Sequence, residues 1–274
     1  MRILITGAYG ALGTAVRLSL KDFDQVVPKR YELNICNDIQ ISKYNADFIL
    51  HLASETDHEY CDMNPSNCYY VNTIGTANMV SMAKELDIPI IYISTSSVFD
   101  GKKRSPYDVD DEPNPINHYN RSKFFGELIA LSYYKAYVLR AGWMFGGGES
   151  LDKKFVSKII KKIKQGHNVI KVCDDCIGSP TYSMDMADAI KKIIITKPEF
   201  GTYHFSNCSE GISRYEFAQE IIRILKSDVS IIPCSIDDLK EEFPCKRTNY
   251  EAIKTSFNLR DWKSALKGYL YANY

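Results

Sequence analysis

The stretch RILITGAYGALGTAV, residues 2–16, joins a short run of apolar, largely β-branched residues to a glycine turn and the start of a helix. Gly7, Gly10 and Gly13 recur at every third position of that turn. A turn of this kind lets the backbone approach a pyrophosphate, and the helix N-terminus offers it free N–H groups. The stretch therefore predicts a dinucleotide-binding βαβ unit rather than a tight turn without a ligand.

Apolar runs and helical segments continue to alternate through the first half of the chain. Strands are expected at 2–6, 24–27, 48–53, 88–94 and 136–141, and helices at 11–21, 37–44, 65–86 and 117–134. Continuous apolar strands separated by helices are typical of a parallel sheet that is covered on both faces. We therefore expect an α/β protein with a Rossmann-type, doubly wound parallel sheet.

The second half of the chain shows weaker order after the glycine-rich loop 145–150. Amphipathic patterns predict helices within 152–166 and over 213–225. We expect residues 1–145 to form the NAD(P)-binding Rossmann domain. Residues 146–274 are expected to form mainly a smaller C-terminal substrate-binding lobe, with some segments returning to the Rossmann sheet.

Composition favours a small-molecule partner. The 34 basic and 34 acidic residues cancel, which gives no reason to expect a nucleic-acid or membrane partner. No stretch approaches the ~20 apolar residues of a membrane helix, and a strand stands where a signal peptide would lie. The eight cysteines indicate a reducing cytoplasm. The one CxxC, Cys173 and Cys176, lacks a second ligand pair, so no metal site is expected.

The end of the second strand bears on the choice of dinucleotide. Lys29 and Arg30, in VVPKRYELN (26–34), stand where NAD-selective proteins commonly carry an acid for the ribose hydroxyls. Two cations suit a 2′-phosphate, so we expect NADPH to be preferred. Glu32 lies close by and leaves the use of NADH open.

A tyrosine and a lysine stand one helical turn apart in HYNRSKFFGE (118–127). A neighbouring ammonium and an oxidised nicotinamide both favour the phenolate of Tyr119, which would make it a usable acid or base. Tyr250 and Lys254 repeat the spacing, but they follow no hydroxyl-bearing strand and are expected in an ordinary surface helix or loop. Thr95, by contrast, ends the fourth strand at the edge where open α/β sheets bind ligands.

Taken in order, several further stretches are similar to landmarks of the dTDP-4-dehydrorhamnose reductase family, in the extended branch of the short-chain dehydrogenase/reductase superfamily. These stretches are RYELNICND, HLASETDHEYCDMNPSNCYYVNTIGTANM, STSSVFDG, YNRSKFFGE, LRAGWMFGGG, GSPTYSMDMADAI, GTYHFSN and SRYEFAQEII. The resemblance spans the chain. It implies NAD(P)H-dependent reduction of the 4-keto group of a nucleotide-linked 6-deoxy sugar, for the synthesis of surface polysaccharide precursors.

The resemblance also implies roles for individual residues. Thr95 would orient the carbonyl, Tyr119 would donate the proton, and Lys123 would lower the pKa of Tyr119 and hold the nicotinamide ribose. The expected cofactor-binding residues are Thr6, Gly7, Tyr9, Gly10, Ala11, Leu12, Gly13, Lys29, Arg30, Asn34, Ile35, Leu52, Ala53, Ser54, Asn72, Tyr119 and Lys123. The expected substrate residues are Ser96, Ser97, Trp143 and Arg247.

Departures from the family pattern concern the substrate side. The family usually has Asp-Tyr where this chain has Ser96-Ser97, so an acid and an aromatic residue are lost there. Asn34 replaces an aspartate, Cys176 replaces a glutamine, and KRTNY (246–250) replaces an Arg-Pro motif, although Arg247 still matches the arginine. The sugar, the nucleotide and the choice between a monomer and a homodimer are left open.

Two other functions fit the same motifs. An epimerase or dehydratase of nucleotide sugars uses the same residues but returns the hydride to its substrate. A cofactor-binding regulatory subunit would have kept the fold and lost the reaction. The missing Asp-Tyr pair motivates this second alternative, and the intact set of Thr95, Tyr119 and Lys123 argues against it.

Overall fold

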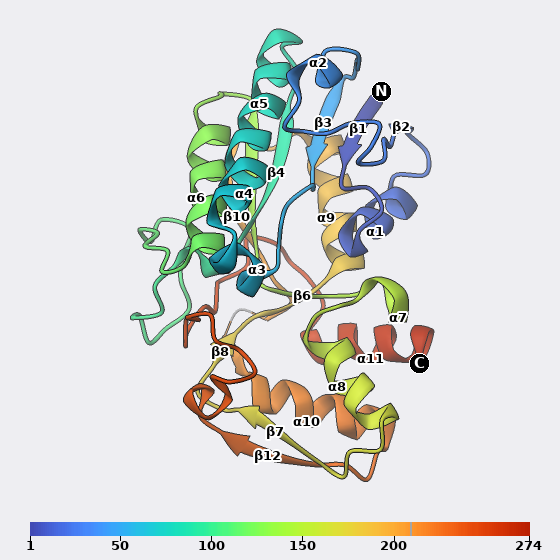
Figure 1. Ribbon diagram of the computed structural model, residues 1–274. Helices are drawn as coiled ribbons and strands as arrows, with labels where there is room; N and C mark the ends of the chain where they lie inside the picture. Colours follow the sequence, from blue (N-terminus) through green and yellow to red (C-terminus); the bar gives the residue numbers. More distant parts are fainter. Residues whose placement is uncertain (209) are drawn as a thin grey trace.

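A parallel sheet forms the upper half of the computed structural model (Figure 1), which describes residues 1–208 and 210–274. Within these residues the sheet has six strands in the order β2-β1-β3-β4-β5-β10, and every neighbouring pair is parallel. The strands are β1 (Arg2–Thr6), β2 (Asp24–Val26), β3 (Phe48–His51), β4 (Ile90–Thr95), β5 (Ala136–Ala141) and β10 (Gly201–Phe205). The expected doubly wound sheet is confirmed.

Helices cover both faces of this sheet (Figure 1). On one side pack α1 (Ala11–Ser19) and α9 (Ser183–Thr196), and on the other α5 (Gly75–Glu85) and α6 (His118–Leu131). Because successive strand residues point to opposite faces, Ile3 and Ile5 enter the first core while Leu4 enters the second. Burial on both faces explains why the strands are continuously apolar.

The segment between β3 and β4 differs from the single helix expected at 65–86. It contains α3 (His58–Met63), α4 (Pro65–Tyr69), a π-helical turn η1 (Tyr70–Ile74) and then α5. The side chain of Asp57 caps α3 by accepting a hydrogen bond from the N–H of Tyr60. The helix expected at 37–44 is the shorter α2 (Asp38–Ile41).

After β5 most of the chain forms the lower half of the molecule, while α9 and β10 return to the upper half (Figure 1). Its strands pair two by two: β6 (Trp143–Phe145) with β9 (Pro180–Tyr182), β7 (Val169–Cys173) with β12 (Ser230–Cys234), and β8 (Ile177–Gly178) with β11 (Ile212–Ser213). Its helical segments are α7 (Gly148–Leu151), α8 (Phe155–Lys164), α10 (Arg214–Leu225), η3 (Ile236–Leu239) and α11 (Trp262–Asn273). Their apolar faces share a third core that includes Trp143, Phe217 and Leu266.

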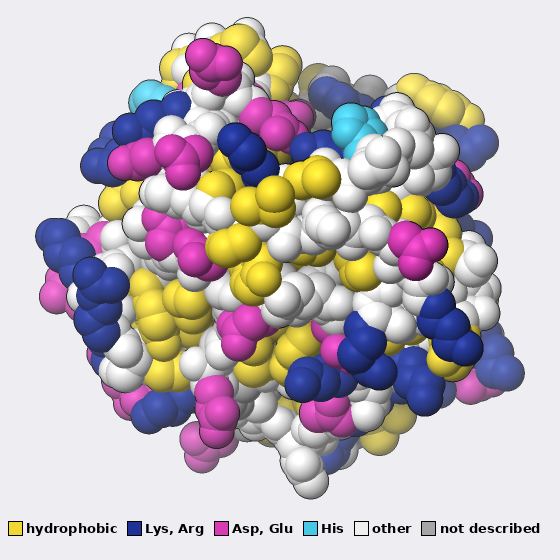
Figure 2. Space-filling model, turned by 90° about the horizontal axis from the view of Figure 1, so that it is seen from below, with side chains coloured by type: hydrophobic (Ala, Val, Ile, Leu, Met, Phe, Trp, Pro, Cys, Tyr) yellow, Lys and Arg dark blue, Asp and Glu magenta, His cyan; other side chains and the backbone are white. Residues whose placement is uncertain are grey.

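The surface of the lower half carries mixed charge. Figure 2 shows lysines and arginines interspersed with acidic and apolar side chains on the face seen from below, as the balanced composition implies. No helix of the described residues is both long and apolar enough to cross a bilayer. All eight cysteines lie within the described residues, and each is a free thiol.

Candidate active site

The glycine turn between β1 and α1 is tightly packed backbone. Gly7 has φ +68°, and a Cβ on it would lie 2.7 Å from the backbone nitrogen of Ala53. A Cβ on Gly13 would lie 2.3 Å from the carbonyl oxygen of Gly7. Gly10 caps α1 without a side-chain hydrogen bond, so the first N–H groups of the helix have no side-chain acceptor there. These features fit a site for a pyrophosphate.

The ends of β1 and β3 are joined to each other beside this turn. The hydroxyl of Thr6 lies 2.8 Å from Nδ1 of His51 and accepts a hydrogen bond from the Ala53 N–H at 3.2 Å. Thr6 is buried, whereas Leu52, Ala53 and Ser54 are half-buried along the edge of the sheet. Since β2 and β3 lie on opposite sides of β1, this edge is the switch point at which open α/β sheets bind ligands.

The residues expected near the adenine and its ribose follow β2. Lys29, Arg30 and Asn34 are exposed, and Ile35 is buried against Gly75. The Asn34 side chain accepts a hydrogen bond from the N–H of Cys36. Tyr9 is also exposed, and its hydroxyl donates to the carbonyl of Val27. Two cations and a tyrosine are thus available to a ligand at the outer end of the glycine turn.

Tyr119 and Lys123 lie on α6, which packs beside β4. Both side chains are buried, and Thr95 lies near enough to the Tyr119 phenol for its hydroxyl to influence the pKa of that phenol. Burial raises the pKa of Tyr119 above its ordinary value, and the Thr95 hydroxyl opposes that rise. The protein's own groups therefore keep the phenol protonated, which differs from the lowered pKa that the resemblance implies.

Lys123 connects to Asn72 through Ser54. The ammonium donates to the Ser54 hydroxyl at 3.2 Å, and Ser54 donates to Oδ1 of Asn72 at 2.8 Å. The π-helical turn brings the Asn72 amide to this position, where it also donates to the Ser122 hydroxyl at 2.9 Å. Burial lowers the pKa of Lys123 to about 7, although the charges of Glu127 and Cys68 act to raise it.

A buried ion pair lies behind Lys123. The Glu127 carboxylate accepts hydrogen bonds from Nε and Nη2 of Arg140, the latter at 2.9 Å, and it also accepts from the Ser94 hydroxyl. Both charged side chains are almost fully buried. Paired in this way, Glu127 is a negative charge that favours the ammonium form of Lys123.

The substrate residues expected at 96 and 97 do not point their hydroxyls to an open pocket. Ser96 and Ser97, in the short helix η2 (Ser96–Val98), are buried, and both hydroxyls donate to the carboxylate of Glu251. The indole N–H of Trp143 donates to the other oxygen of the same carboxylate. Three of the four residues expected near the substrate, Ser96, Ser97 and Trp143, therefore meet at Glu251.

The expectation that YEAIK (250–254) is ordinary surface is wrong for its centre. Glu251, Ala252 and Ile253 are buried. Backbone bridges explain this burial, since the segment pairs with Ile177 and with Tyr107. Lys254 is exposed, as expected, and pairs with Asp108.

A group of cations surrounds His58, whose ring centre lies 4.3 Å from that of Tyr119. Burial and the charges of Arg247, Lys154 and Arg214 hold the pKa of His58 well below its usual value. Arg247 pairs with Glu59 and leaves its buried Nε without a hydrogen-bond partner. Three cations thus bring positive charge beside Tyr119, and Glu59 offsets part of it. Of these three cations, the sequence alone predicts only Arg247 as a site residue.

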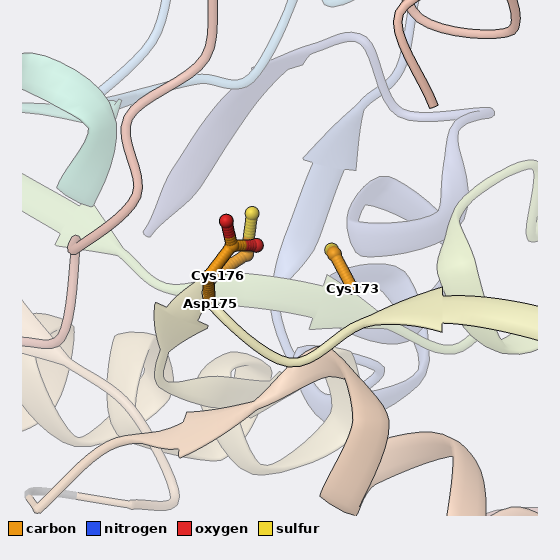
Figure 3. A group of neighbouring side chains, drawn as sticks. All are labelled: Cys173, Asp175 and Cys176. Carbon is orange, nitrogen blue, oxygen red and sulfur yellow. The ribbon is translucent and has the colours of Figure 1, made fainter. Parts of the chain in front are cut away.

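A second group of chemically active side chains lies at the turn from β7 to β8 (Figure 3). The sulfur atoms of Cys173 and Cys176 and a carboxylate oxygen of Asp175 all lie within 4.8 Å of one another. Both Asp175 oxygens already accept hydrogen bonds, from the Ser235 hydroxyl and the Ile236 N–H, at 2.9 Å each. The turn joins two strands, whereas a thioredoxin-like pair lies at a strand-to-helix turn.

Three features together define a short-chain dehydrogenase/reductase. They are the glycine turn, the hydroxyl of Thr95 at the end of β4, and the Tyr119–Lys123 pair on α6. Residues 1–273 match the family model described as the RmlD substrate binding domain. The chain belongs to this family.

Relatives and solved structures agree with this assignment. The chain is 30% identical to a dTDP-4-dehydrorhamnose reductase of Mycolicibacterium smegmatis, over 97% of this chain and 84% of the relative. A crystal structure of a dTDP-4-dehydrorhamnose reductase from Clostridium acetobutylicum is similar with a TM-score of 0.91 and 32% identity, covering 99% of each chain. A Bacillus anthracis enzyme of the same name, in complex with NADP, gives 0.90 and 29%, covering 100% of this chain and 99% of that one.

Proposed function

We propose that this protein uses NAD(P)H to reduce the 4-keto group of a nucleotide-linked sugar, in the synthesis of polysaccharide precursors. The observation that carries the proposal is the buried Tyr119 phenol on the same helix as Lys123, which is hydrogen-bonded to Ser54 at the sheet edge next to a glycine turn that fits a dinucleotide. Family membership over residues 1–273 supports it, since relatives are named for 4-keto sugar reduction.

The fit of the dinucleotide rests on backbone geometry. A Cβ at Gly7 or Gly13 would collide with backbone atoms, and Gly10 leaves the first N–H groups of α1 without a side-chain acceptor. The dinucleotide would be held by the expected residues of the glycine turn, by the ends of β1 to β3, and by Asn72 and Lys123. It supplies the hydride when bound. Lys29 and Arg30 are exposed where a 2′-phosphate would need them, so NADPH is preferred.

The protein's own groups supply the proton. Tyr119 is kept neutral by burial and donates its phenolic proton to the oxygen of the reduced carbonyl. Thr95 orients that oxygen by hydrogen bonding. Lys123 stabilises the resulting phenolate, and the Ser54–Asn72 hydrogen bonds hold Lys123 in place. Positioning and charge stabilisation provide most of the acceleration.

The substrate lies between the sheet edge and the segments contributed by residues 146–274. Arg214, Arg247 and Lys154 surround His58 next to Tyr119, and they bind the diphosphate that links the sugar to its nucleoside. Trp143 lines the sugar side. Free thiols in this number also favour the cytoplasm as the place of reaction.

The test is NADPH oxidation, followed by absorbance, with 4-keto sugars linked to dTDP, GDP, UDP and CDP. The Tyr119→Phe variant is expected to bind NADPH as the wild type does and to lose about 10²- to 10⁴-fold in turnover. Activity of this variant at the wild-type level would contradict the assignment. Conversion of a sugar without net loss of NADPH would instead identify an epimerase or dehydratase.

A further inference from the structure

Glu251 is a buried carboxylate that accepts hydrogen bonds from three of the residues expected near the substrate. One oxygen, Oε2, accepts from the hydroxyl of Ser97 and, at 3.3 Å, from that of Ser96. The other, Oε1, accepts from the indole N–H of Trp143. The residue is 9% exposed. A carboxylate is costly to bury unless such donors compensate it, so packing alone gives no reason for an acid here.

The backbone around Glu251 holds the carboxylate rigidly. Its own N–H donates to the carbonyl of Ile177 at 2.8 Å, and the Ile177 N–H donates to the carbonyl of Asn249 at 2.7 Å. On the other side, the Tyr107 N–H donates to the carbonyl of Ala252 at 2.8 Å. The segment is therefore fixed to β8 and to residue 107 at once, and the acid has a defined position.

The three donors are parts of the proposed reaction site. Ser96 and Ser97 directly follow Thr95, so fixing their hydroxyls fixes the end of β4 that presents Thr95 to the carbonyl. Trp143 is held on its nitrogen edge by Glu251, while its ring packs against Gly178 and the guanidinium of Arg214. Since each serine proton is donated to Glu251, the serine hydroxyls have only lone pairs left for other partners.

We propose that Glu251 is a positioning residue of the reductase site, which ties Trp143 to the segment after Thr95 and so sets how the sugar meets both. This inference rests on the proposed function. Glu251 supplies, from the C-terminal part of the chain, the carboxylate to which Ser96 and Ser97 donate. Sugar selection then depends on where Glu251 holds Trp143 relative to the end of β4, because the hydroxyls of Ser96 and Ser97 are buried and engaged.

The experiment compares kcat and KM for the best 4-keto sugar in four proteins. Glu251→Ala is expected to lose about 10²-fold in kcat/KM, as misplaced reacting groups do. Glu251→Gln keeps the shape and should lose less, with a raised KM. Adding Ser96→Asp to Glu251→Ala restores a carboxylate beside Thr95 and should recover at least about tenfold of that loss. The NADPH dissociation constant should stay near the wild-type value in all of them.

Glu216→Gln is the matched control, because Glu216 is a carboxylate of the same half that only caps α10. It should lower thermal stability without changing KM. A purely structural role for Glu251 predicts this same behaviour for Glu251→Ala, together with no rescue by Ser96→Asp. An unchanged KM in Glu251→Ala would overturn the inference, and so would the absence of rescue by Ser96→Asp.

A wild-type protein that turns over no 4-keto sugar would contradict the proposed function. The inference is then decided by nucleotide-sugar binding, followed by Trp143 fluorescence in a Trp262→Phe background, since the chain has two tryptophans. Weaker binding in Glu251→Gln supports it, and unchanged binding overturns it.

Discussion

The guanidinium of Arg214 lies 3.5 Å from the ring centre of Trp143 and stacks on it. Arg214 is the first residue of α10, and its charge reaches both Glu251 and His58. Burial lowers the pKa of Arg214 to about 10, which still leaves it charged at neutral pH. The stack therefore presents a fixed cation beside an aromatic surface, an arrangement that suits a diphosphate next to a sugar.

Arg214→Gln is expected to weaken the binding of dTDP by about 10- to 150-fold, since a charge-assisted hydrogen bond contributes roughly 1.5–3 kcal/mol. Isothermal titration calorimetry measures this directly. Arg223→Gln, on the same helix, is the control, because Arg223 pairs with Glu220 and is mostly exposed. Equal losses in the two variants would mean that general charge, and not Arg214, attracts the nucleotide.

Gly13→Ala should damage the cofactor turn. The new Cβ would lie 2.3 Å from the Gly7 carbonyl oxygen and 2.6 Å from a backbone carbon of Ala8, and neither atom can move independently of the turn. We expect a loss of about 1–3 kcal/mol in stability and at least tenfold weaker NADPH binding. Gly10→Ala meets only one atom, at 3.5 Å, so its thermal unfolding midpoint should stay close to that of the wild type.

Replacing Lys29 and Arg30 together by alanine should change the choice of dinucleotide. Both side chains are exposed after β2, and a 2′-phosphate is the only part of NADPH that NADH lacks. The ratio of kcat/KM for NADPH to that for NADH is expected to fall by about tenfold or more. Lys21→Ala removes another exposed lysine and should leave the ratio unchanged. An unaltered ratio in the double variant would assign the preference elsewhere.

The buried Lys123 should make stability depend on pH. Its pKa is about 7 in the folded protein, whereas an unfolded lysine titrates near ~10.4. Between these values the unfolded chain binds the proton and the folded protein does not, so stability rises with pH, by at most about 1.4 kcal/mol per pH unit. Urea unfolding at pH 7, 8 and 9 should show this rise in the wild type relative to Lys123→Met.

Lys135→Met serves as the control for that measurement. Asp87 raises the pKa of Lys135, so the lysine keeps its proton in both states over this range and its loss should not alter the slope. Parallel stability curves for the wild type and Lys123→Met would show that the Lys123 ammonium remains protonated in the folded protein.

The fold could be predicted because its signals are local. The runs at Ile3–Ile5, the glycine turn and the amphipathic helices each require only neighbouring residues, and the structure confirms the sheet that they imply. Element ends were less accurate. The sequence predicted one helix at 65–86 because its apolar residues recur throughout, and it offers no simple signal for the π-helical turn at 70–74.

The site was predictable where its residues share one edge of the sheet. Thr95, Tyr119, Lys123 and Ser54 meet there, while their roles stay predictions. Glu251 and Arg214 could not be found, because long-range contacts place them: a backbone bridge to Ile177 buries Glu251, and Trp143 positions Arg214. Glu251 lies inside YEAIK (250–254), and the spacing of Tyr250 and Lys254 in that segment gives no indication of a buried acid.

The π-helical turn has a consequence for the phase of the helices around it. Each residue of an α-helix advances by about 100°, so the added residue of a π-helical turn rotates everything after it relative to everything before it. Asn72 can therefore face Ser54, while Met79, Val80 and Ala83 of α5 still face the sheet. One helical wheel drawn through 65–85 would place one of these two sets on the wrong side. The turn therefore lets one helical segment supply a side chain to the active site and, a few residues later, an apolar face to the core.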